Sequence, residues 1–81
     1  MISVEKMTQK ELKAKFAVKL KEFMKRDGYA ISDIASYLNL DENTVAYHLN
    51  PKDFRMPTAI CIVNLSKLFK CSVDELLGLE W

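Results

Sequence analysis

Residues 31–50, ISDIASYLNLDENTVAYHLN, contain two short amphipathic runs separated by residues that favour a turn. Apolar residues recur at helical spacing in the first run and predict a helix over about 31–38: Ile31, Ile34, Ala35 and Leu38. Asn39 tolerates the left-handed backbone that would end this helix, and Asp41 is a favourable N-cap for a second helix over about 42–49. Two short helices joined by a tight turn are the pattern of a helix-turn-helix unit.

A longer helix is predicted before this pair, over about residues 9–26. Thr8 and Glu11 have the spacing of a capping box at its start, and Gly28 is the expected left-handed stop after its end. Its apolar residues form one stripe opposite a lysine-rich face: Leu12, Phe16, Leu20, Phe23 and Met24.

Two further helices are predicted after the pair. Thr58 can cap the run AICIVNLSKLF, whose apolar residues surround the helix, so we expect this helix to be the central, buried one. Ser72 and Glu75 again have the spacing of a capping box, which predicts a last helix over about 73–77. Five helices without a convincing strand indicate an all-α fold.

The 81 residues suffice for one small domain, and 49% hydrophobic residues provide a core for it. We expect a helix-turn-helix domain over residues 9–79, preceded by an N-terminal arm over residues 1–8 and followed by a tail over 80–81. The alternation of Ile2, Val4 and Met7 fits a strand, an arm or a segment folded over the core, and does not decide among them.

Charge is distributed unevenly along the chain although the net charge is only +1. The first 26 residues are rich in lysine, whereas residues 27–49 contain four acidic residues and no Lys or Arg. Any contact with a polyanion must therefore draw its positive charge from the first helix and from the segment after Asn50.

The sequence carries no pattern of an enzyme or of a metal site. Cys61 and Cys71 have no second pair and no histidine at ligand spacing, so we expect two small buried thiols in a reducing compartment and no bound metal or cofactor. His48 lacks a nucleophile or carboxylate partner, and we expect it to be a part-buried, neutral core residue. Since the chain has neither the apolar stretch of a signal peptide nor a run long enough to span a membrane, we expect a cytoplasmic protein without enzymatic activity.

The order, length and register of these helices resemble the lambda-repressor-like helix-turn-helix domains of phage repressors, Cro and xenobiotic-response-element-type regulators. The resemblance covers about residues 11–79, and SVDELLGL near the end of the chain is its most specific string. Residues throughout the chain fall where that family has its core and turn positions: Leu20, Phe23, Gly28, Ile34, Ala35, Leu38, Asn39, Leu40, Thr44, Val45, Pro57, Thr58 and Cys71–Leu79.

The resemblance implies a sequence-specific DNA-binding transcriptional regulator, a repressor of phage or bacterial type that binds double-stranded DNA as a homodimer. Base-reading positions in the second helix of the pair correspond to Glu42, Asn43 and Tyr47, and Thr44 is a further candidate for DNA contact. The family's contacts to the DNA backbone after this helix correspond to Asn50, Lys52 and Arg55. Leu79 and Trp81 are candidates for a dimer contact, and packing against the last helix is an equal alternative.

Four positions depart from the family pattern. Ile31 stands where the family has a phosphate-binding Gln, and Asn39 stands where it has Gly. Met24 and Leu49 replace the Arg and Glu that many members pair, so an apolar contact is expected there. The acidic segment 27–49, which contains no Lys or Arg, supports an alternative function. This alternative is a protein-protein interaction module that keeps the helix-turn-helix scaffold and binds a partner protein, as an antirepressor-like or partner-binding regulator would.

Overall fold

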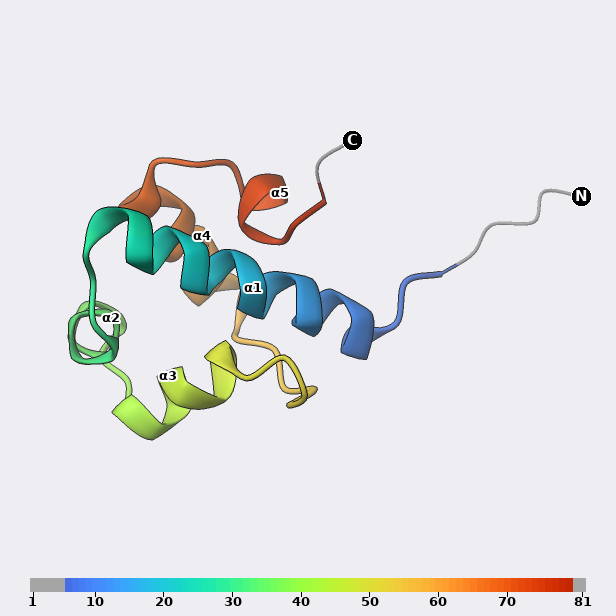
Figure 1. Ribbon diagram of the computed structural model, residues 1–81, viewed down its shortest axis with the longest axis horizontal. Coiled ribbons are helices and arrows are strands. Elements are labelled where there is room, and N and C mark those ends of the chain that lie inside the picture. The colour runs from blue at the N-terminus through green and yellow to red at the C-terminus, as the bar shows by residue number, and fades with distance from the viewer. Residues whose placement is uncertain (1–5, 80–81) are drawn as a thin grey trace, which may run out of the picture.

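The computed structural model describes residues 6–79. Within this range the chain forms five helices and no strand, which confirms the predicted all-α architecture. The helices are α1 (Gln9–Asp27), α2 (Ile31–Leu38), α3 (Glu42–Leu49), α4 (Ala59–Phe69) and α5 (Val73–Leu76). In Figure 1, α1 crosses the middle of the molecule, with α2 and α3 on one side of it and α5 on the other.

Polar side chains at the helix starts explain most of these bounds. The Thr8 hydroxyl accepts a hydrogen bond from the Glu11 backbone N–H at 3.1 Å, and the Ser72 hydroxyl accepts one from the Glu75 N–H at 3.0 Å. Asp41 is the N-cap of α3, but within the described residues its side chain makes no capping hydrogen bond. That prediction was correct about where the helix starts and wrong about the expected cap interaction.

Left-handed residues end α1 and α2. Gly28 has φ 74° and ψ 27°, and Asn39 has φ 56° and ψ 48°. Asn39 is a residue type that tolerates this conformation without the freedom of glycine. The following Leu40 N–H donates to the Ala35 carbonyl at 2.9 Å, which turns the chain sharply and lets α3 pack against α2.

The core is built from all five helices around the buried side of α1. Its buried apolar residues are Phe16, Ala17, Leu20, Met24, Ile34, Ala35, Val45, Leu65, Phe69 and Leu76. The sequence placed Leu12 and Phe23 on the apolar stripe of α1, but both are only half-buried, and the fully buried positions include Lys13 and Ala17 instead. The stripe is therefore rotated relative to the prediction.

α4 is not the fully buried helix that its composition predicted. Leu65 and Phe69 are each 1% exposed, whereas Ile60 and Val63 are 64% and 38% exposed. α4 buries one face in the core and leaves apolar side chains on the other, because α1 occupies the central position that the sequence assigned to α4. Cys61 and Cys71 are free and half-buried, less buried than expected.

Candidate nucleic-acid interface

The outward face of α3 carries most of the side chains that are predicted to contact DNA. Val45 is fully buried and His48 is 8% exposed, and these two residues fix the inward side of the helix. On the opposite side the exposed residues follow helical spacing: Glu42, Asn43, Ala46, Tyr47 and Asn50. Thr44 is half-buried at the edge of this face, and Lys52 and Arg55 are exposed in the loop that follows.

His48 lies inside, as expected for a core histidine. Within the described part of the chain its Nδ1 is buried without a hydrogen-bond partner. Burial lowers the pKa of His48, and the nearby Lys13 charge lowers it further. His48 is therefore neutral near pH 7 and belongs to the packing of α3, away from the outward face.

One stripe of α1 holds the C-terminal end of α3 and the loop after it. Gln9, Lys13, Ala17 and Lys21 are spaced by four residues, so they lie along one side of the helix. The Gln9 side-chain amide donates to the Phe54 carbonyl oxygen at 2.7 Å. Ala17 and Lys21 border a pocket of about 250 Å³ at the end of α3. The contacts of this stripe hold the C-terminal end of α3 and the loop after it against α1.

Lys13 makes the strongest of these contacts. Its side chain is fully buried, and its Nζ donates to the carbonyl oxygens of Tyr47, Asn50 and Asp53 at 2.7, 2.9 and 3.0 Å. Burial lowers the pKa of Lys13, the Asp53 carboxylate raises it and Arg55 lowers it. Three acceptors match the three protons of an ammonium group, so Lys13 supplies the positive charge that the C-terminus of a helix favours.

The loop after α3 is folded by its own side chains. The Asn50 Oδ1 accepts from the Lys52 N–H at 3.0 Å, and the Asp53 Oδ1 accepts from the Arg55 N–H at 2.8 Å. These are the local turns that Asn and Asp favour. Lys52 therefore projects from a defined loop next to the exposed face of α3.

Arg55 is tied to two neighbours. Its Nη2 lies 2.6 Å from the Asp53 Oδ2, and its Cζ lies 3.9 Å from the centroid of the Tyr47 ring. The Arg55 guanidinium holds the pKa of the Asp53 carboxyl well below its usual range, and the same pairing raises the pKa of Arg55. The charge of Arg55 is thus largely compensated within the protein.

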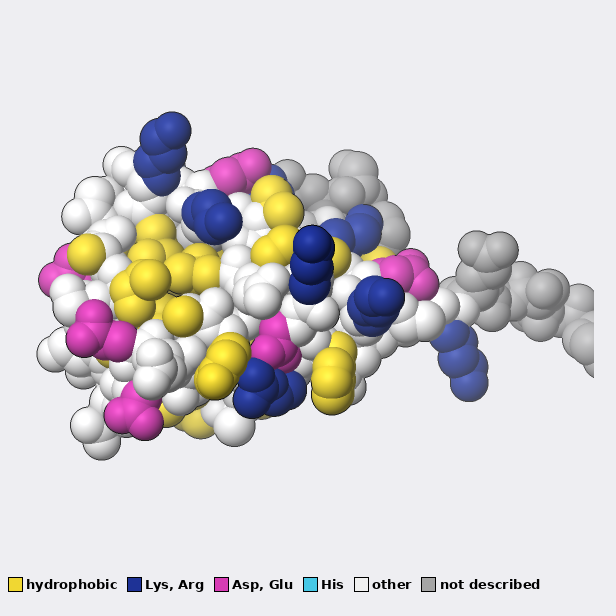
Figure 2. Space-filling view, turned by 60° about the horizontal axis from the view of Figure 1, so that its bottom comes forward, with side chains coloured by type: hydrophobic (Ala, Val, Ile, Leu, Met, Phe, Trp, Pro, Cys, Tyr) yellow, Lys and Arg dark blue, Asp and Glu magenta, His cyan; other side chains and the backbone are white. Residues whose placement is uncertain are grey.

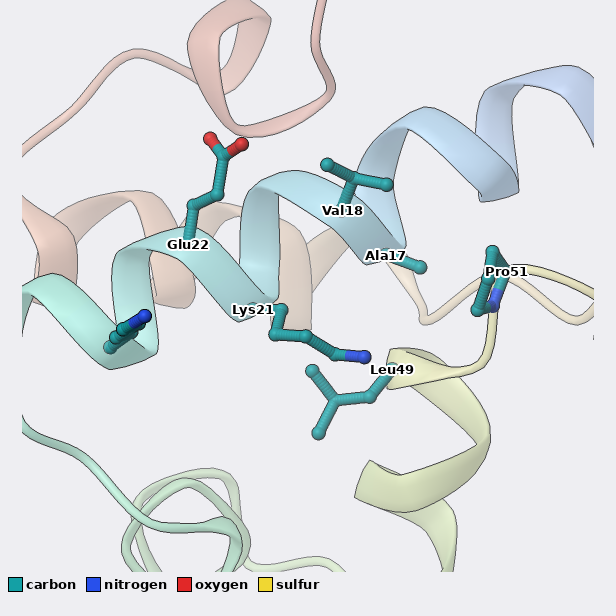
Figure 3. Close-up of a pocket in the computed structure, with 7 residues that line it drawn as sticks. Ala17, Val18, Lys21, Glu22, Leu49 and Pro51 are labelled. Atoms are coloured by element: carbon teal, nitrogen blue, oxygen red, sulfur yellow. The ribbon is translucent and has the colours of Figure 1, made fainter.

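Two further lysines of α1 lie beside the end of α3. Lys21 and Lys25 line the pocket that Leu49 and Pro51 close from the other side. In Figure 3, Lys21 and Leu49 point toward each other, while Glu22 points away from them. Leu49 is half-buried and packs against the core cluster that contains Met24.

Charge is distributed unevenly over the face that contains α2 and α3. Figure 2 shows only acidic charged side chains at the left edge of this face, where Figure 1 places α2, whereas Lys and Arg side chains lie along the top and toward the right with further acidic side chains among them. A hydrophobic patch lies between them. This face therefore has an acidic end, and the rest of it carries side chains of both signs.

Within residues 6–79, no group of three or more His, Cys, Asp or Glu side chains is arranged to hold a metal ion. No helix in this range is long and apolar enough to cross a bilayer. Leu79 is half-buried, whereas Trp81 and most of the predicted N-terminal arm lie outside the described residues.

Comparison of the chain with protein-family models, with curated proteins and with solved structures gave no match.

Sequence reasoning missed the residues that support this face, namely Gln9, Lys13 and Asp53. A signal for Lys13 was present, because positions 13, 16, 17, 20 and 24 have the spacing of one buried helix face. Lysine is almost never fully buried unless it is paired, so the apolar pattern alone predicts a stripe that begins at Leu12.

Proposed function

We propose that this protein is a sequence-specific DNA-binding transcriptional regulator of the phage repressor or Cro type. The observation that carries the proposal is the outward face of α3. It presents the exposed side chains of Glu42, Asn43 and Tyr47 from a short helix whose opposite side is buried in the core. Asn can bind adenine through two hydrogen bonds, and Glu can accept from the cytosine amino group.

Lysines that surround the end of α3 supply positive charge for the DNA backbone in this proposal. Lys52 is exposed in the loop after the helix, and Lys21 and Lys25 are exposed on α1 beside it. Contacts from these residues would fix the register of the protein on the duplex, while α3 reads bases in the major groove. A homodimer would place two such helices at half-sites roughly 34 Å apart.

A second candidate function is supported by the acidic end of the same face. Asp33, Asp41 and Glu42 are exposed, and Asp53 compensates the charge of Arg55. A surface of this kind, with Tyr37 45% exposed beside it, suits a basic partner protein better than it suits phosphate. The alternative is therefore a protein-interaction module built on the same helices.

Selection of bound sequences from a random duplex pool, at two salt concentrations, tests the proposal. We expect one enriched motif with two-fold symmetry. Three phosphate-binding lysines per protomer predict a slope of log affinity against log salt of about −5 for a dimer, at roughly −0.9 per phosphate. Failure to enrich any sequence even at low salt would overturn the proposal and favour the protein-interaction module.

A further inference from the structure

The loop after α3 contains an arginine whose geometry differs from that of a phosphate anchor. An arginine that binds phosphate needs its guanidinium fork directed at the ligand. The Arg55 fork instead engages Asp53, with Nε 3.0 Å from Oδ1 and Nη2 2.6 Å from Oδ2. The edge formed by Nε and Nη2, one of the two edges through which a guanidinium binds an anion in a bidentate way, is thus already occupied by a carboxylate.

The flat face of the same guanidinium covers Tyr47. The Arg55 Cζ lies 3.9 Å from the ring centroid, a distance at which a cation is attracted to the ring face. Tyr47 remains 45% exposed on the outward side of α3. Arg55 therefore restricts the orientation of the tyrosine without removing it from the surface.

Asp53 is in turn held in place from the interior. The Lys13 ammonium donates to the carbonyl oxygens of Asp53, Asn50 and Tyr47, so it joins the backbone of the loop to the last turn of α3. The carboxylate of Asp53 accepts from both the backbone and the side chain of Arg55. A continuous chain of contacts thus runs from the core of α1 to the ring of Tyr47.

We propose that Arg55 is a positioning residue that presents Tyr47 to its ligand, with Lys13 and Asp53 holding Arg55 in place. The proposal rests on the DNA-binding function proposed above and deepens it. It assigns the specificity at this end of α3 to the orientation of Tyr47, and it assigns backbone attraction to Lys52 and not to Arg55. A planar fork is required for this role, so lysine cannot replace Arg55.

Arg55→Lys provides the decisive test, because it keeps the positive charge but loses both the fork and the stacking face. We expect the preference for the best base over the next best to fall about fivefold or more at one or two positions of the selected motif, with the salt slope unchanged. Lys52→Gln is the matched control, and it should lower the salt slope of the dimer by about two, one for each protomer, and leave the motif intact.

Proton NMR of the protein without DNA tests the contact itself. Arg55 side-chain protons stacked on Tyr47 should show an upfield ring-current shift that is lost in Tyr47→Leu and reduced in Asp53→Asn. Asp53→Asn is a substitution outside the core, so this test does not depend on a Lys13 variant that fails to fold. Absence of the shift in the parent protein would overturn the inference.

The two proposals fail in different ways. If the parent protein enriches a motif and Arg55→Lys keeps its full base preference, then Arg55 is a simple cation and the inference alone is overturned. If the parent protein enriches no sequence, the DNA-binding function is overturned, and the role of Arg55 in reading bases fails with it.

Discussion

Lys13 and Tyr47 connect the core of the protein to its candidate reading surface. The buried Lys13 Nζ lies 2.7 Å from the Tyr47 carbonyl oxygen, while the Tyr47 side chain is 45% exposed on the other side of α3. One residue of α3 thus provides the backbone anchor and the exposed side chain. The position of the outward face consequently depends on a side chain of α1.

Replacement of Lys13 by methionine should destabilise the protein. The substitution keeps an unbranched apolar stem but removes three hydrogen bonds from a charged donor, and we expect a loss of about 2–3 kcal/mol in the free energy of unfolding. Urea denaturation of the parent and of the variant measures this difference in the free energy of unfolding. Lys15→Met on the exposed side of the same helix is the control and should stay within about 0.5 kcal/mol of the parent. Equal stability of the two variants would contradict the importance of the Lys13 contacts.

His48 should make stability depend on pH in the mildly acidic range. Its pKa in the folded protein lies below the ordinary value of 6.5, so the unfolded chain binds its proton more readily. The stability that depends on neutral His48 is fully present above pH 6.5. It is lost as the pH falls from this value through the folded-state pKa. Thermal melts at pH 7.5 and at about pH 5, above the ordinary carboxylate range, should show this decrease.

A His48→Leu variant separates this effect from carboxylate titration. It removes both the titrating group and a buried ring nitrogen without a partner among the described residues, so it should gain about 1 kcal/mol at neutral pH. Its melting temperature should change less than that of the parent between the two pH values. An unchanged pH dependence would show that other groups cause the loss.

The C-terminus of α4 offers a stabilising substitution. Lys70 has φ 56° and ψ 44°, a left-handed conformation that costs a residue with a Cβ about 1–2 kcal/mol. Lys70→Gly should therefore raise the free energy of unfolding by about 1 kcal/mol. Lys67→Gly, in the last turn of the same helix, should lower it by a similar amount, about 1 kcal/mol. Loss of stability in both variants would contradict the left-handed cap.

Substitutions on α3 test which side chains read bases under the proposed function. Asn43→Ala and Tyr47→Ala should each relax the preference at one or two positions of the selected motif, by about 1–3 kcal/mol for a lost bidentate contact. Lys52→Ala should weaken binding to all sequences about equally. Competition titrations against a panel of single-base variants distinguish the two patterns. An unchanged motif in both α3 variants would mean that α3 is not the reading helix.

The bounds of α2 and α3 were predictable because they depend on local chemistry. Asn39 permits a left-handed turn whatever surrounds it, and the spacing of Ile34 and Ala35 already shows which side of α2 must be buried. Asn43 and Tyr47, which correspond to base-reading positions of the family that the chain resembles, are exposed on the outward side of α3. The DNA-contact roles of these residues stay predictions.

Other features depended on which helices pack against each other. The composition of α4 predicted burial on all sides, but Ile60 is exposed because α1 takes the centre of the fold. Periodicity cannot rank two helices that compete for one central position, since it describes each helix by itself. The choice depends on how the loops bring the helices together.

The sequence by itself determined the helices and most of their caps, because hydrogen bonds and apolar spacing within a few residues decide them. Only the tertiary structure decided which charged side chains are buried and which are exposed. Lys13 and Lys15 are alike in the sequence, yet one is fully buried against three carbonyl oxygens and the other is exposed. Burial of a charge is favourable only where enough acceptors converge on it, and here α3 and its loop, more than 30 residues away along the chain, bring those acceptors to Lys13.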